Sequence, residues 1–137
     1  MMDLQAAFRA RLLANAPLSA AVSGRIYWGI RPQGSALPAL VLTKVAPGQD
    51  WTHSGPGPMV NPWVQIDIYS ADYPAAGPIA AALQAEMQRL NRVTAGGWTF
   101  FPPGTLASDQ WPGVESLPDG IQAHRVIQDY RFWAEPI

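Results

Sequence analysis

A change of hydrophobic period in the middle of the chain constrains its fold more than any other feature. Between Trp63 and Tyr69, the apolar residues Val64, Ile66 and Ile68 alternate with more polar neighbours, as in a strand with one face on a core. Apolar side chains then recur every three or four positions in an Ala-rich run at Ile79, Leu83, Met87 and Leu90. A helix that follows a strand and carries one apolar stripe is expected to lie on the sheet.

The start of this central helix is set by a proline. Pro78 suits a first-turn position, because its missing N–H is not needed there. We therefore expect the regular helix to begin near Gly77 or Pro78, with residues 72–76 as a lead-in turn.

A second amphipathic helix is predicted at the beginning of the sequence. Leu4, Phe8 and Leu12 recur every four residues, which places an apolar stripe along residues 3–14. Residues 18–22 can add one short turn.

Two further strand regions follow the central helix. Residues 93–100 contain a Gly96-Gly97 pair that can turn a short hairpin, because glycine takes positive φ at little cost. Residues 122–134 alternate, and predict a final strand with Val126, Tyr130 and Phe132 on one face and Arg125, Asp129 and Arg131 on the other.

Three segments rich in turn-forming residues separate these elements. Residues 31–35 lie between two strand-like runs and contain too many turn-formers for a simple hairpin. Residues 46–59 have neither period and are predicted as a long loop or flexible hairpin arm. Residues 102–120 are predicted as a second long excursion, with only a short strand around Val114.

The expected fold is therefore α+β, with a mostly antiparallel or mixed β-sheet, two main helices packed on one face and long loop arms. A chain of 137 residues without an internal repeat is the size of one domain, so residues 1–137 are expected to form a single domain.

Composition limits the classes of function. Charged residues make up only 14% of the chain, against roughly 25% in typical soluble domains. Such a surface suits permanent burial against partners, although a small soluble domain from an Ala-rich proteome would look similar. A net charge of -1 with scattered Arg residues argues against a dedicated nucleic-acid binder. No apolar segment is long enough to cross a bilayer, so the product is expected in the cytoplasm when made.

Catalytic and metal-binding patterns are weak. The chain has no Cys, and His53 and His124 are isolated, with neither a nucleophile elbow nor a His pair at ligand spacing. Asp67 and Asp129 could form a carboxylate pair, but an ion pair of Asp129 with Arg125 or Arg131 is the simpler expectation. Residues 54–58 resemble a phosphate loop, but two prolines there lack the N–H groups that such loops use. We expect no enzyme activity, cofactor or metal.

Six tryptophans leave a binding module for sugars or aromatic ligands as an alternative. Several lie in strand runs, where core packing is expected. Trp51 and Trp111 lie in predicted loops, where an aromatic side chain either anchors a contact with a neighbouring subunit or packs under the loop.

The order of segments resembles the phage tail-completion family, also called tail terminators or tail-to-head joining proteins, of siphophages and gene transfer particles. The resemblance covers nearly the whole chain, and Gln128 stands where an apolar residue would be expected. Its signature pieces are the N-terminal helix, Gly24-Arg25-Ile26-Tyr27, Leu37-Pro38-Ala39-Leu40-Val41-Leu42, Val64-Gln65-Ile66-Asp67 with Tyr69 and the Ala-rich helix, the Gly96-Gly97 turn, and the segment His124 to Trp133.

The resemblance implies a non-enzymatic virion protein at the head-proximal end of the tail. Members form a hexameric ring that caps the tail tube and meets the capsid neck. The implied partners are further copies of the chain, the major tail tube protein and a neck or connector protein, while DNA passes through the channel without specific binding and no membrane is involved. A head-completion or connector protein is the alternative within this class. The candidate interface residues are Arg31, Gln33, Asp50, Trp51, His53, Trp111, Arg125, Asp129 and Arg131.

Overall fold

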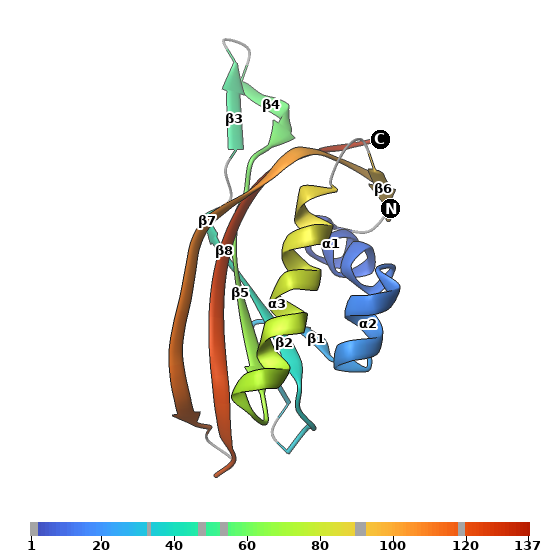
Figure 1. Cartoon of the computed structure of the whole chain (residues 1–137). Helices are drawn as coiled ribbons and strands as arrows, with labels where there is room; N and C mark the ends of the chain where they lie inside the picture. Colours follow the sequence, from blue (N-terminus) through green and yellow to red (C-terminus); the bar gives the residue numbers. More distant parts are fainter. Residues whose placement is uncertain (1–2, 33, 47–48, 53–54, 90–92, 118–119) are drawn as a thin grey trace.

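The computed structural model describes residues 3–32, 34–46, 49–52, 55–89, 93–117 and 120–137 (Figure 1). The elements in chain order are α1 (Leu4–Leu13), α2 (Ala16–Val22), β1 (Ile26–Trp28), β2 (Ala39–Ala46), β3 (Gln49–Thr52), β4 (Gly55–Val60), β5 (Trp63–Ser70), α3 (Tyr73–Gln88), β6 (Val93–Ala95), β7 (Trp98–Ser116) and β8 (Gln122–Pro136).

The described strands form one mixed, curled sheet, and the helices lie together on one of its faces (Figure 1). The strand order is β1-β2-β5-β8-β4-β3, and β7 pairs with the other side of β8. β8 is thus the central strand, flanked by β5 and β4 on one side and by β7 on the other. The predicted α+β class is confirmed.

The N-terminal helix is confirmed, and its start has a local cause. The side chain of Asp3 accepts a hydrogen bond from the Ala6 N–H at 2.7 Å, which satisfies one of the free donors of the first turn. The short turn expected after it is a seven-residue helix, α2, capped in the same way by Asn15. Three helices therefore cover the sheet where the sequence predicted two main ones.

The predicted start of α3 near Gly77 or Pro78 is wrong. The helix begins at Tyr73, because the Asp72 side chain caps it by accepting from the Ala75 N–H at 2.9 Å. Pro78 lies inside the helix, where it lacks the N–H that would bond to the carbonyl of Pro74.

The core lies between the helices and the alternating apolar side chains of β2, β5 and β8. Phe8 of α1 stacks on Phe132 at 4.8 Å between ring centroids and meets Phe100 at 6.2 Å. Gln128 is buried in β8, where its Oε1 accepts a hydrogen bond from the Tyr130 hydroxyl at 2.7 Å. A polar residue is tolerated at this core position because its acceptor is satisfied.

The Gly96-Gly97 hairpin is confirmed. Ala95 pairs with Trp98 across the turn, and the two glycines have φ of 57° and 88°. Positive φ at both central residues is the requirement of the tight turns that suit hairpin twist. The two strand-like runs around residues 31–35 are also present, but β1 and β2 pair in parallel, so the segment between them crosses over instead of forming a hairpin.

The second long excursion, expected at residues 102–120, is wrong for most of its length. β7 runs through it to Ser116 and pairs with β8, with register shifts between Phe101 and Thr105, Leu106 and Ser108, and Gln110 and Gly113. The first and third of these shifts span the prolines that argued against a strand, Pro102 with Pro103 and Pro112. Proline is tolerated at bulges and on edge strands, where its missing N–H removes no ladder bond.

Residues 46–59, predicted as a loop or hairpin arm, contain the β3–β4 hairpin, which projects beyond the end of the sheet (Figure 1). Among the described residues, its pairing to the rest of the sheet is the single bridge between Val60 and Ala134. No helix among the described residues is long and apolar enough to span a membrane.

Candidate assembly interface

The sheet face opposite the helices carries most of the charged residues that the sequence singled out. Core side chains of β5 and β8 alternate with residues that point to this face. We call it the open sheet face. On these two strands it includes Trp63, Gln65, Asp67, Tyr69, Arg125, Ile127, Asp129, Arg131 and Trp133.

An ion pair organises the centre of the open sheet face. The Arg125 guanidinium lies 3.1 Å from Oδ1 of Asp67, whose side chain is only 7% exposed. Gln65 donates a long hydrogen bond to the same carboxylate, and Arg125 also lies 5.9 Å from the Tyr69 ring centroid. Arg125 is therefore not the partner that the sequence offered for Asp129. The strand register explains this, since it sets Asp67 diagonally opposite Arg125.

Asp129 and Trp63 have buried polar atoms without hydrogen bonds. Oδ1 of Asp129 and Nε1 of Trp63 find no partner in the described part of the chain. Burial, and secondarily the negative charge of Asp67, raise the pKa of Asp129 above its ordinary value of 3.8. Arg131 lies over the Trp63 ring at 5.6 Å from its centroid, a cation–π geometry.

We expect Asp129→Asn to raise the free energy of unfolding at neutral pH. A carboxyl group whose pKa is higher in the folded than in the unfolded protein favours the folded state when protonated, so its ionised form is destabilising. The gain should shrink as the pH falls through the raised pKa and vanish below the unfolded value. Urea unfolding of both proteins across this range measures it, and a loss of stability at neutral pH would contradict it.

A second surface feature is an aromatic cluster at the N-terminal end of α3. The ring of Tyr73 lies 5.5 Å from Trp111 of β7 and 5.8 Å from His124 of β8. Tyr73 is 54% exposed and Trp111 is 38% exposed. Trp111 is held by a hydrogen bond from its Nε1 to Asp109 at 3.1 Å. It is thus an ordered, solvent-facing aromatic side chain on a strand, not in a loop as predicted.

Sequence reasoning missed Tyr73 because its partners are distant along the chain. The available signal was its place next to Asp72, a capping residue type, which puts it in the exposed first turn of a helix.

The remaining candidates fall in the loop after β1 and in the β3–β4 hairpin, which we call the arm. The Arg31 guanidinium donates to the backbone carbonyl and to the hydroxyl of Ser35, so it closes its own loop. Asp50 and Trp51 belong to β3. Gln33 and His53 lie outside the described residues.

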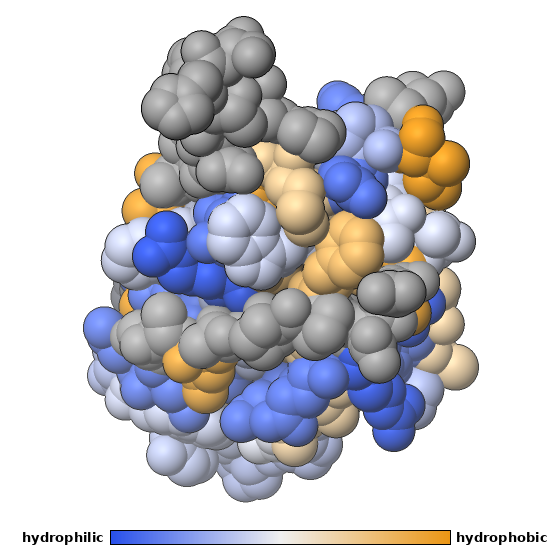
Figure 2. Space-filling model, turned by 90° about the horizontal axis from the view of Figure 1, so that it is seen from above, coloured by the Kyte–Doolittle hydropathy of each residue, from blue (hydrophilic) through white to orange (hydrophobic). Residues whose placement is uncertain are grey.

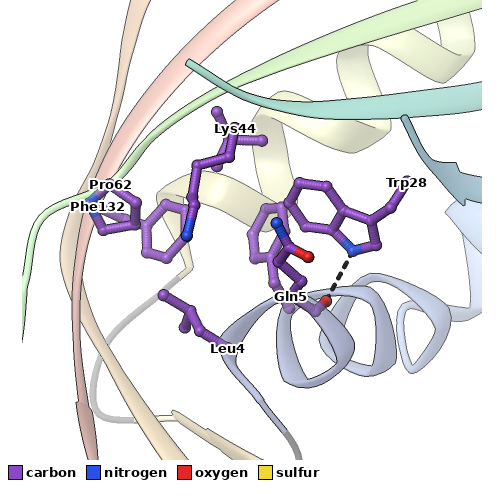
Figure 3. Close-up of a pocket in the computed structure, with 8 residues that line it drawn as sticks. Leu4, Gln5, Trp28, Lys44, Pro62 and Phe132 are labelled. Carbon is purple, nitrogen blue, oxygen red and sulfur yellow. Dashed lines mark hydrogen bonds between the residues drawn. The ribbon is translucent and has the colours of Figure 1, made fainter. Parts of the chain in front are cut away.

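No arrangement typical of a reaction centre emerges in the described residues. A small pocket between α1 and the sheet has a cavity volume of about 10 Å³, which is room for about one water molecule (Figure 3). Its wall is fixed by a hydrogen bond from Trp28 Nε1 to the Gln5 carbonyl at 2.8 Å. The described residues contain no group of three or more acidic or His side chains that could hold a metal ion.

The upper end of the molecule, seen in Figure 2, mixes hydrophobic and hydrophilic residues among the atoms that are coloured. The visible apolar residues do not merge into one broad patch there.

The fold is that of a known virion component. A chain in the solved virion of a native gene transfer agent particle is similar over 96% of this chain and 94% of its own, with a TM-score of 0.66 and 18% identity. A second solved structure matches 98% of this chain and 93% of its own, with a TM-score of 0.58 and 17% identity. No match was found among the curated proteins.

The family model for tail completion protein gp17 matches residues 6–135. The chain therefore belongs to this family of structural phage tail proteins.

Proposed function

We propose that the chain is a tail terminator. As a single domain, it would assemble into a hexameric ring that caps the last layer of the tail tube, ends tube growth and joins the tube to the capsid neck. The observation that carries the proposal is the family match, which extends over residues 6–135 and so leaves only short ends unmatched.

The surface geometry supports an assembly role. Tyr73 and Trp111 form an ordered, exposed aromatic pair, and such residues dominate the energetics of protein interfaces. On the open sheet face, Asp129 and Trp63 hold buried polar atoms that have no hydrogen-bond partner among the described residues. A neighbouring subunit that supplies hydrogen bonds there would remove a cost that the single chain bears.

The proposed partners follow from the same role. They are further copies of the chain, the major tail tube protein and a neck protein, and the place of action is the head-proximal end of the tail in the virion. We further propose that the protein is not an enzyme and that DNA passes through the ring without specific binding. Strong, salt-sensitive DNA binding by the purified protein would argue against that last point.

Electron microscopy of the purified protein, alone and mixed with tail tubes, tests the proposal. We expect six-fold rings, or a cap on one end of each tube. Native mass measurement gives the number of copies independently. A protein that stays a single chain and never attaches to tube ends would contradict the terminator role.

We expect Trp111→Ala to weaken ring or tube association while the single chain stays folded. An aromatic anchor at an interface contributes about 2 kcal/mol or more, which is a loss of roughly 30-fold in affinity. Sedimentation against concentration measures the change. Trp111→Phe is the control, since it keeps an aromatic ring beside Tyr73 while it shortens the side chain's ring system and removes the hydrogen bond to Asp109. Unchanged association of Trp111→Ala would remove this residue from the interface.

A further inference from the structure

The outer edges of β3 and β7 lie on opposite sides of the sheet in each copy of the chain, and both are open among the described strands. β7 flanks β8 on one side, while β4 and then β3 lie beyond its other side. Among the described strands, β3 pairs only with β4, and β7 beyond Phe100 pairs only with β8. Open edges of this kind are templates for a strand of another chain.

Proline identifies the usable edge of the arm. Trp51 pairs with Pro56, which has no N–H, so this cannot be the type of pair that exchanges two hydrogen bonds. The N–H and C=O of Trp51 therefore point away from β4, to the outer side of β3. On the outer side of β4, Pro56 offers no donor. The arm can extend a sheet through β3.

A hydrogen bond at the end of β7 determines which of its backbone N–H groups point away from β8. The Leu117 N–H donates to the Ile121 carbonyl at 2.8 Å, so this pair is of the hydrogen-bonded type. The types alternate along the two strands, and the register continues through Ser116↔Gln122 to Val114↔His124. The N–H groups of Ser116 and Val114 therefore point away from β8, and the Val114 side chain is 59% exposed.

We propose that the outer edge of β3 in one copy adds to the outer edge of β7, near Val114 and Ser116, in the next copy. This rests on the proposed ring. The occupant is a second copy because one chain carries both edges, on opposite sides of one sheet, so the contact is head-to-tail and repeats with every subunit. A partner strand on β3 would stabilise the arm, because a two-stranded hairpin is marginally stable alone and only one bridge between described residues joins it to β8.

Cross-linking tests the proposal directly, because the chain has no Cys. The double variant Thr52→Cys/Ser116→Cys, treated with a short bismaleimide, should give a ladder of covalent oligomers up to the full ring. Each single variant can give dimers at most. The control Thr52→Cys/Ala20→Cys moves one thiol to an exposed position of α2 and should lose the bands above dimer.

A backbone variant separates edge pairing from mere proximity. In the double-Cys protein, Val114→Pro removes an N–H that β8 does not use, and the ladder should be lost while the unfolding midpoint stays near that of Val114→Ala. Val114→Ala should keep the ladder. The inference is overturned if the ladder survives Val114→Pro. It is also overturned if Thr52→Cys/Ser116→Cys gives no more bands above the dimer than the control Thr52→Cys/Ala20→Cys.

Microscopy of the same samples distinguishes this inference from the proposed function. Rings without a ladder would overturn edge pairing and leave the terminator role standing. A ladder from open filaments would support edge pairing and contradict ring closure. The absence of both rings and ladder would overturn both.

Discussion

Phe8→Ala is expected to lower the free energy of unfolding by about 3–5 kcal/mol, as for other buried aromatic residues truncated to alanine. Phe8 is 1% exposed and connects α1 to the sheet. Its ring stacks on Phe132 and meets Phe100 and Trp28, each at 6.2 Å. Removal of the ring leaves a cavity among three aromatic side chains that cannot easily close around it.

Urea denaturation followed by far-ultraviolet circular dichroism measures this loss. Phe8→Leu is the matched control, because it retains a large apolar side chain and should cost clearly less. An equal, small effect of both variants would show that α1 contributes little to the stability of the sheet.

Glu86→Ala is expected to cost about 3 kcal/mol, because it removes the buried partner of an ion pair whose other side chain, Arg11, is 23% exposed. Glu86 lies in α3 and is 1% exposed. Its Oε1 is 2.6 Å from Arg11 Nε of α1, and its Oε2 accepts from Asn15 Nδ2, the capping residue of α2, at 2.8 Å. One carboxylate thus joins all three helices, and its loss leaves a guanidinium without a counter-charge.

The matched control is Gln88→Ala, an exposed change on the same helix, which should alter stability by less than about 0.5 kcal/mol. Glu86→Gln is informative as well, because it keeps an acceptor for Asn15 but removes the charge that faces Arg11. If Glu86→Ala lowered the free energy of unfolding no more than Gln88→Ala, the ion pair would not contribute to stability.

Elements with a clear period were predictable from the sequence. Strand β5, the stripe of α1 and the turn at Gly96-Gly97 depend on local patterns, and all are confirmed. β7 was not predictable, because its prolines and glycines gave a loop signal. What makes it a strand is the free edge of β8, a partner that no local window contains.

The contacts of the candidate site depended even more on distant pairing. The pairing of Arg125 with Asp67 follows from the register of β5 on β8, which the sequence does not specify residue by residue. The contact of Trp111 with Tyr73 joins β7 to α3 and has the same origin. The sequence indicated which side chains face away from the core, but not which of them meet. The interface roles proposed for the candidate residues remain predictions.

The central place of β8 has a consequence for biosynthesis. β8 follows all the other described strands in the sequence, yet it joins β5 to β7 by pairing with both. A nascent chain must therefore release residues 122–136 from the ribosome before its sheet can close, and contacts this distant form slowly. Under the edge pairing proposed above, nascent copies on one messenger cannot join through β7 before β8 has been translated.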